Sequence, residues 1–135
     1  MPITLVDSSV LLDILTDDAT WAKWSSDRLA EAAEYGPMAI DPAIYAEVSV
    51  RFTRIEDLDD ALPAEDYRRT ALPWTASFLA AKAFVEYRRR GGSRTSTLPD
   101  FFIGAHAAVA DLTLLTRDPH RQRSYFPTVH LIAPD

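Results

Sequence analysis

The sequence predicts an α/β protein with a mostly parallel sheet covered by helices on both faces. Short apolar runs alternate with stretches of helical periodicity along the chain, which is the pattern of successive βαβ units. No internal repeat, low-complexity tract or linker interrupts this alternation over the 135 residues. A hydrophobic content of 47% is sufficient for one core. We therefore expect a single domain, residues 1–135.

The first part of the chain is expected to hold two strands and three helices. The expected elements are a strand at 3–6, a short helix from about 10 to 15, an amphipathic helix at 21–35, a strand at 38–40 and a helix from 42 to about 54. Gly36 and Pro37 favour the end of the second helix. Asp41 is a typical N-cap and Pro42 a typical first helical residue, so together they predict where the third helix begins.

The second part predicts further helices and the strands that complete the sheet. The expected elements are weak helical turns at 55–62 and 64–71, a short strand at 72–75, a long helix at 76–90, a helix beginning near 99, and strands at 112–116 and 129–132. Gly91 and Gly92 favour the end of the long helix. Six aromatic residues have helical spacings that favour core packing: Trp21, Trp24, Phe78, Phe84, Phe101 and Phe102.

Composition excludes several classes of function. The chain has no cysteine, which excludes disulfides, thiolate catalysis and sulfur-ligated metals. Its net charge of −6 argues against indiscriminate nucleic-acid binding, although basic residues gather at 87–94 and 116–123. These clusters fit either solvated helix ends or a rim that binds phosphates. No apolar run is long enough to cross a bilayer and the first residues lack a signal-peptide pattern, so we expect a cytoplasmic protein.

Four carboxylates occupy positions of interest in such a fold, where ligands bind outside the carboxyl ends of the strands. Asp7 directly follows the first strand, and Asp118 comes two residues after a later one. Glu47 lies beside the apolar stripe of its helix, as a boundary residue or a functional one. Asp100 lies in the first turn of a helix, where an acid also favours the helix dipole. Because this helix leads into the strand at 112–116, periodicity places Asp100 at the opposite end of that strand, unless the preceding loop brings it across.

The contexts of these four acids are similar to those of a known family. The matching segments are "LVDSSVLLDIL", the helix that carries Glu47, "YRRRGG" with "LPDFFIGAHAA", and "LLTRDPHRQRSYFPTVHLI", which together span nearly the whole chain. The sequence resembles the PIN-domain ribonucleases, and more narrowly the VapC toxins of bacterial and archaeal toxin-antitoxin pairs. The resemblance implies a three-layer α/β/α sandwich in which the head of the Asp100 helix reaches one acidic pocket.

The resemblance also implies the roles of individual residues. It assigns metal binding and catalysis to Asp7, Glu47, Asp100 and Asp118. Three of these acids are expected as direct ligands of Mg²⁺ or Mn²⁺, whereas Glu47 is expected to ligate through water or to orient the nucleophile.

Further polar residues are expected to support this site. Ser9 and Thr116 match polar positions that neighbour the pocket. Arg94 and Arg117 are expected to contact substrate phosphates, with Arg121 and Arg123 as weaker candidates. His106 falls about 240° around its helix from Asp100, so we expect a surface or packing residue instead of a ligand. His120 and His130 have no expected role.

Clustered carboxylates suit the implied chemistry. They repel one another, which raises some of their pKa values unless a divalent cation neutralises them. Mg²⁺ prefers oxygen ligands and assists attack on phosphodiesters. The resemblance thus implies a metal-dependent endoribonuclease that acts on RNA, pairs with a cognate antitoxin and forms a homodimer, and the lack of a long apolar run indicates no membrane partner.

Two other functions stay open at this point. A PIN-like fold could serve as an interaction module without catalysis. A phosphoacceptor receiver domain would share the length and the acidic strand ends, but it needs adjacent acids after the first strand and a late lysine. This chain has Asp7 followed by Ser8, and no lysine after Lys82.

Overall fold

The computed structural model describes residues 2–92 and 98–134, and five strands within these ranges form one sheet. The strands are β1 (Thr4–Val6), β2 (Met38–Ile40), β3 (Tyr67–Arg69), β4 (Thr113–Leu115) and β5 (Leu131–Ile132). Their order across the sheet is β3-β2-β1-β4-β5, and every neighbouring pair is parallel. The predicted α/β class is confirmed, and the sheet of the described residues is wholly parallel.

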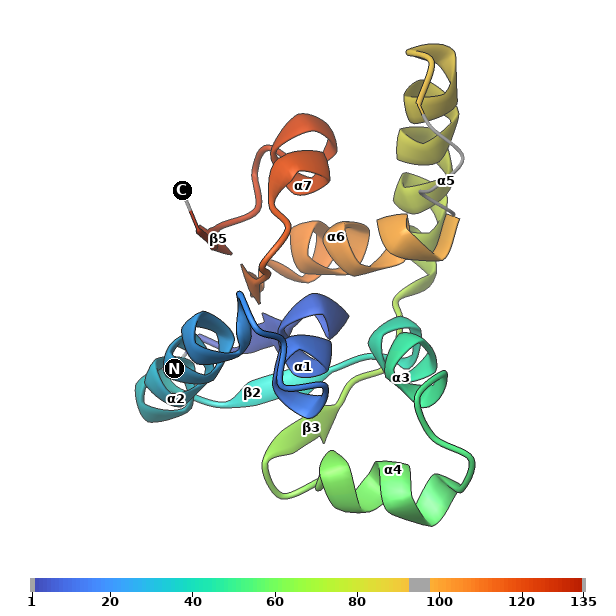
Figure 1. The fold of residues 1–135 in the computed structure, drawn as a ribbon. Helices are drawn as coiled ribbons and strands as arrows, with labels where there is room; N and C mark the ends of the chain where they lie inside the picture. Colours follow the sequence, from blue (N-terminus) through green and yellow to red (C-terminus); the bar gives the residue numbers. More distant parts are fainter. Residues whose placement is uncertain (1, 93–97, 135) are drawn as a thin grey trace.

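Seven helices of the described residues flank this sheet. They are α1 (Ser8–Leu15), α2 (Ala22–Tyr35), α3 (Pro42–Ser49), α4 (Ile55–Ala61), α5 (Trp74–Arg89), α6 (Leu98–Ala110) and α7 (His120–Tyr125). In Figure 1, α5, α6 and α7 gather in the upper part of the view, whereas α2 and α4 lie in the lower part, beside β2 and β3. The arrangement is an α/β/α sandwich, as expected from the sequence.

The strand order reverses direction beside β1, and this reversal creates a crevice. The chain steps from β1 to β2 to β3, then returns to place β4 on the other side of β1. Right-handed crossovers send the connecting helices to opposite faces of the sheet on the two sides of such a point. The segments that follow β1 and β4 therefore diverge, which leaves space at the carboxyl edge of the sheet. Val6 is in register with Leu115 beside this space.

The third helix begins where the sequence predicts and ends earlier. The Asp41 carboxylate accepts a hydrogen bond of 2.9 Å from the Ile44 N–H, and a proline occupies the first turn. The helix stops at Ser49 instead of continuing to about 54. The Ser49 hydroxyl bonds back to the Tyr45 carbonyl at 2.6 Å, and the next N–H groups make tighter three-residue bonds, which end the helix.

Two predictions between 64 and 75 are wrong. The segment 64–71 is not a helical turn, because 67–69 is the edge strand β3. The segment 72–75 is not a strand, because Pro73 is the N-cap of α5 and Trp74 is its first residue. Pairing with β2 overrides the weak local helical preference of the first segment. The structure also forms α7 at 120–125, where the sequence predicts a loop.

The core lies along the central strands, as the apolar runs predict. Its largest fully buried side chains include Leu5, Ile40, Leu114 and Phe101. Phe78 contradicts the aromatic prediction, because it is 68% exposed.

The position of Phe78 follows from how α5 packs. The buried residues of α5 are alanines, Ala76, Ala80 and Ala83, and they pack in a cluster with Phe101 and Ala105 of α6. Small side chains allow the two helices to approach closely. The aromatic residues at 74 and 78 are left on the surface of α5.

No helix within 2–92 or 98–134 is long and apolar enough to cross a bilayer.

Gly104 provides a test of the packing between α6 and α7. A Cβ atom at this position would collide with the Gln122 side-chain oxygen and the Phe126 ring. Replacing a helical glycine by alanine favours the helix by about 1 kcal/mol, whereas overpacking a core costs about 1–3 kcal/mol. We expect Gly104→Ala to lower the free energy of unfolding by about 1 kcal/mol or more, measured by urea denaturation. An unchanged or higher stability would contradict this tight packing.

Candidate active site

A pocket of about 310 Å³ opens at the carboxyl edge of the sheet, where the strand order reverses. Its lining residues are Asp7, Ser8, Ser9, Leu12, Glu47, Asp100, Ile103, Arg117, Asp118, Arg121 and Gln122. All four acids singled out by the sequence line this one pocket. They come from the end of β1, from α3, from α6 and from the segment after β4. Segments far apart in the chain thus place four carboxylates around one space.

Asp7 is buried at the base of this pocket and is held by two hydroxyl groups. Its Oδ2 accepts hydrogen bonds from Ser9 Oγ at 2.8 Å and from Thr116 Oγ1 at 2.7 Å. Burial raises the pKa of Asp7, while these hydroxyls and the positive charge of Arg121 act in the opposite direction. Ser9 and Thr116 therefore lie where the sequence places them and orient the Asp7 carboxylate.

Ser8 lies between two of the acids. Its hydroxyl donates to Glu47 Oε1 at 3.1 Å and is 3.4 Å from Asp7 Oδ1. Sequence reasoning missed this contact, although Ser8 precedes Ser9 in the same "VDSS" segment. The contact ties the start of α1 to the second turn of α3.

Glu47 is a second acid whose pKa the pocket raises. Burial raises its pKa to about 7, and the negative charges of Asp7 and Asp100 add to this effect. A hydrogen bond between the Glu47 and Asp100 side chains acts in the same direction. The carboxylates are thus close enough to repel one another strongly.

Asp100 lies at the carboxyl edge of the sheet, and the periodicity argument that placed it at the opposite end of the strand was wrong. A helix that leads into a parallel strand runs antiparallel to that strand, so its first turn lies near the strand's carboxyl end. Asp100 is in the first turn of α6, which leads into β4. No unusual loop is needed to bring it across.

Asp118 lies on an exposed turn that hydrogen bonds hold against α1. The Thr116 hydroxyl accepts from the Asp118 N–H at 3.1 Å, and the Ser9 hydroxyl accepts from the Arg117 N–H at 3.1 Å. These bonds fix the segment after β4 beside the segment after β1. The Asp118 carboxylate therefore borders the pocket from its solvent side.

Arg117 lines the pocket, but its guanidinium also binds another acid. Its Nε and Nη2 donate to Asp13 at 3.2 and 3.1 Å, and its charge lies 5.6 Å from the centre of the Trp21 ring. Asp13 is buried and also accepts from Ser25 Oγ at 2.8 Å. The sequence signal for Asp13 is that it is the one polar residue in the apolar run "VLLDIL". A phosphate contact for Arg117 stays a prediction.

The other basic and histidine residues differ in whether they line the pocket. Arg94 lies outside the described residues. Arg121 lines the pocket on α7, whereas Arg123 does not, and the exposed His120 and His130 lie outside the lining as well. His106 packs in the interior and is fully buried, so the surface alternative for it was wrong.

The side chains of the pocket offer carboxylate and hydroxyl oxygens, which are the kinds of ligand that a hard cation prefers. Within the described residues, however, no three acidic or histidine side chains converge closely enough to hold a metal ion. In this arrangement Asp7 turns to its hydroxyl partners, and Glu47 shares a hydrogen bond with Asp100. Such contacts are what repelling carboxylates adopt without a counter-charge.

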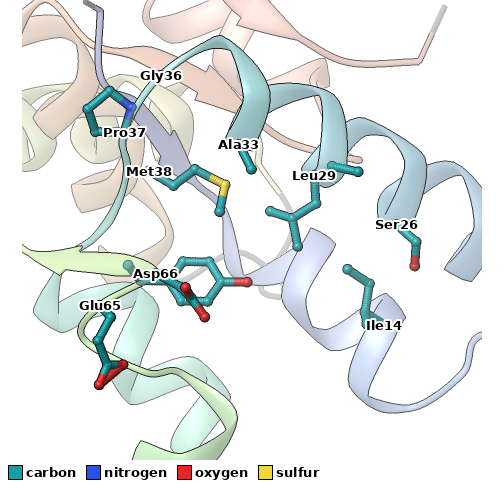
Figure 2. A pocket seen from close by; sticks show the side chains of 11 residues that line it. Ile14, Ser26, Leu29, Ala33, Gly36, Pro37, Met38, Glu65 and Asp66 are labelled. Atoms are coloured by element: carbon teal, nitrogen blue, oxygen red, sulfur yellow. The ribbon is translucent and has the colours of Figure 1, made fainter.

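A larger groove, of about 610 Å³, lies at the opposite edge of the sheet (Figure 2). It is lined by α2, the end of α1 and the first residues of β2 and β3. Met38 and Leu29 face this space from β2 and α2, and Glu65 and Asp66 form an acidic side. Although it is larger, this groove lacks the four-acid arrangement of the pocket at the carboxyl edge.

The raised pKa of Glu47 predicts a pH-dependent stability. Between the ordinary glutamate pKa of 4.5 and about 7, the folded protein keeps a proton that the unfolded chain releases. Stability from this group is therefore full below pH 4.5 and is lost as the pH rises through 7. We expect Glu47→Gln without metal to melt close to wild type at pH 5 and about 5 °C higher at pH 8, since solvent screens part of the effect.

Glu34→Gln, on the exposed surface of α2, controls for the loss of one negative charge. Its melting temperature should differ from wild type by a similar amount at both pH values. A difference for Glu47→Gln that stays constant from pH 5 to pH 8 would show that the pocket does not perturb this acid.

Comparison with known proteins gives the family. Residues 4–126 match the PIN domain model. The fold is similar to VapBC2 from Rickettsia felis, solved bound to a promoter DNA fragment, with a TM-score of 0.73, 16% identity, and 98% of this chain and 99% of that chain covered. VapBC-1 from nontypeable Haemophilus influenzae gives a TM-score of 0.71 at 14% identity, covering 97% of both chains. FitAcB from Neisseria gonorrhoeae also gives 0.71 at 14% identity, covering 96% of both. No curated protein sequence matches. Because the PIN domain model matches most of the chain, from residue 4 to residue 126, the chain belongs to the PIN domain family.

Proposed function

We propose that the protein is a Mg²⁺- or Mn²⁺-dependent endoribonuclease and the toxin of a type II toxin-antitoxin pair. The observation that carries this proposal is the meeting of Asp7, Glu47, Asp100 and Asp118 around one pocket at the carboxyl edge of the sheet. PIN domains are generally nucleases. An all-oxygen acidic pocket matches phosphodiester hydrolysis better than any chemistry that needs a thiolate or an imidazole.

The four acids have distinct roles in this proposal. Asp7, Asp100 and Asp118 would hold the cation directly, and Glu47 would act through water or orient the nucleophile. When bound, a divalent cation activates water and offsets the charge that grows on the phosphate. Ser9 and Thr116 hold the Asp7 carboxylate in a fixed orientation, so that less reorganisation is needed on binding.

RNA is the proposed substrate, reached in the cytoplasm. Arg121 and Arg117 border the acidic pocket and supply positive charge where a phosphodiester would enter. The planar N–H donors of a guanidinium group match phosphate oxygens. Arg94 stays a predicted phosphate contact.

An antitoxin protein is the proposed partner, in line with the toxin-antitoxin complexes that share this fold. The groove of Figure 2 combines the apolar side chains of Met38 and Leu29 with the carboxylates of Glu65 and Asp66. This surface complements an amphipathic segment with basic residues on its rim. The exposed Trp74 and Phe78 of α5 offer apolar surface for a second copy of the chain.

Replacing Asp100 separates catalysis from helix capping. Asparagine caps a helix about as well as aspartate, so Asp100→Asn keeps any capping bond and removes the charge. We expect RNA cleavage with Mn²⁺ to fall by more than about 100-fold, because a ligand is lost. The gain in melting temperature on adding Mn²⁺ should also shrink. Cleavage by wild type should stop in excess EDTA.

Asp57→Asn is a matched control, because Asp57 also lies in the first turn of a helix, α4, and is exposed outside the pocket. It should keep full activity and lose at most about 1 kcal/mol of dipole interaction. Undiminished cleavage and an undiminished Mn²⁺ shift in Asp100→Asn would show that this acid is only a helix cap. Absence of cleavage in wild type with either metal would favour the interaction module instead.

A further inference from the structure

Asp41 and His106 form a buried polar pair that the proposed chemistry does not use. Asp41 Oδ2 lies 2.8 Å from His106 Nδ1, and both side chains are fully buried. The other oxygen of Asp41 caps α3 through the Ile44 N–H. His106 Nε2 is buried and has no hydrogen-bond partner among the described residues. The histidine ring is thus anchored through Nδ1 alone, in a helix whose neighbouring residues are apolar.

This pair joins the two helices that carry Glu47 and Asp100. Glu47 follows Asp41 by six residues on α3, and Asp100 precedes His106 by six residues on α6. Six residues correspond to about 9 Å along a helix axis. Two polar contacts therefore tie α3 to α6 where they run in opposite directions. One is the Asp41–His106 bond, and the other, about one and two-thirds turns away, is the Glu47–Asp100 bond.

The spacing indicates what the buried pair contributes. A slip of one residue between the helices shifts one acid past the other by about 1.5 Å, which is enough to disrupt a ligand arrangement. Apolar side chains would fill the same interior volume without selecting a register, whereas a directional bond between buried groups selects one. A cap for α3 alone would need only one oxygen of Asp41.

We propose that Asp41 and His106 are positioning residues: their buried bond sets the register of α3 against α6 and so holds Glu47 and Asp100 at the spacing that the metal site needs. This inference rests on the proposed function of the acidic pocket. Neither residue lines that pocket.

The test uses variants that remove the Asp41–His106 bond but keep either the cap of α3 or the buried volume of the histidine. Asp41→Ser keeps a helix-capping oxygen but is too short to reach His106. His106→Leu removes the bond and keeps apolar volume, whereas His106→Asn keeps a nitrogen donor near the Nδ1 position. Leu58→Ala, at a buried position of α4, is a control that weakens the core away from both the pocket and the groove.

The readouts are Mn²⁺ affinity, measured by electron paramagnetic resonance of the free ion, and kcat and KM for RNA. We expect Asp41→Ser and His106→Leu to bind Mn²⁺ about tenfold more weakly and to lower kcat about 10- to 100-fold with little change in KM. The double variant should be no worse than either single one, and His106→Asn should recover most of both values. Leu58→Ala should keep wild-type Mn²⁺ affinity even where its melting temperature falls as far as that of Asp41→Ser or His106→Leu.

If His106→Leu does not fold, Asp41→Ser carries the same test. If Asp41→Ser and His106→Leu show the same Mn²⁺ affinity and kcat as Leu58→Ala, the positioning role is overturned and the proposed function is left intact. The failure of His106→Asn to recover either value would have the same consequence. Wild-type protein that binds no Mn²⁺ would overturn the proposed function itself, and this inference with it.

Discussion

The parallel pairing of β1 with β4 is the constraint on which the acidic pocket depends. The Asp7 N–H donates to the Leu115 carbonyl at 2.9 Å, so the chain leaves β1 and β4 at the same level of the sheet. The two segments then diverge to opposite faces, and their first polar residues meet across the gap. Thr116 reaches Asp7, and Ser9 reaches the Arg117 backbone. Backbone pairing between β1 and β4 thus fixes the part of the site around Asp7, independently of the acids that the helices contribute.

Glu47 and Asp100, the two acids on helices, add negative charge next to Asp7 and so lower the folding stability of the metal-free protein. Burial and the neighbouring carboxylates raise the pKa of Glu47 to about 7, and burial raises the pKa of Asp7. A carboxyl group whose pKa is raised on folding destabilises the folded state at neutral pH. A pocket that concentrates negative charge in this way is the environment that a divalent cation stabilises. The instability and the proposed activity therefore have the same physical origin.

The sequence predicts well those features that depend on local signals. The apolar runs predict the core strands, and Asp41 with Pro42 predicts where α3 begins. The positions of Asp7 and Asp118 just after two strands are sufficient to place both at the carboxyl edge of a parallel sheet, whereas Ser9 and Thr116 come from the resemblance to a family. The resemblance to a family adds Glu47 and Asp100, which no local signal distinguishes from a boundary residue and a helix cap.

Features that depend on pairing over long distances could not be predicted in this way. Strand β3 forms because residues 67–69 lie next to β2, not because of their own propensity. The bond between Asp41 and His106 joins residues 65 apart, and neither alone indicates the other. Likewise, Arg117 was expected to be available to substrate, and only the fold shows that Asp13 holds it. Phe78 shares its helical spacing with core residues, and the packing of alanines decides its exposure.

Crystals grown with Mn²⁺ offer the most direct test of the central claim, that the four acids form a metal site. Anomalous diffraction at the manganese absorption edge locates the ion without reference to activity. We expect a peak in the pocket within bonding distance of the Asp7 and Asp100 carboxylates, with Glu47 turned away from its hydrogen bond to Asp100. Crystals in which the pocket shows no peak at saturating Mn²⁺, with the acids in their metal-free contacts, would contradict the account.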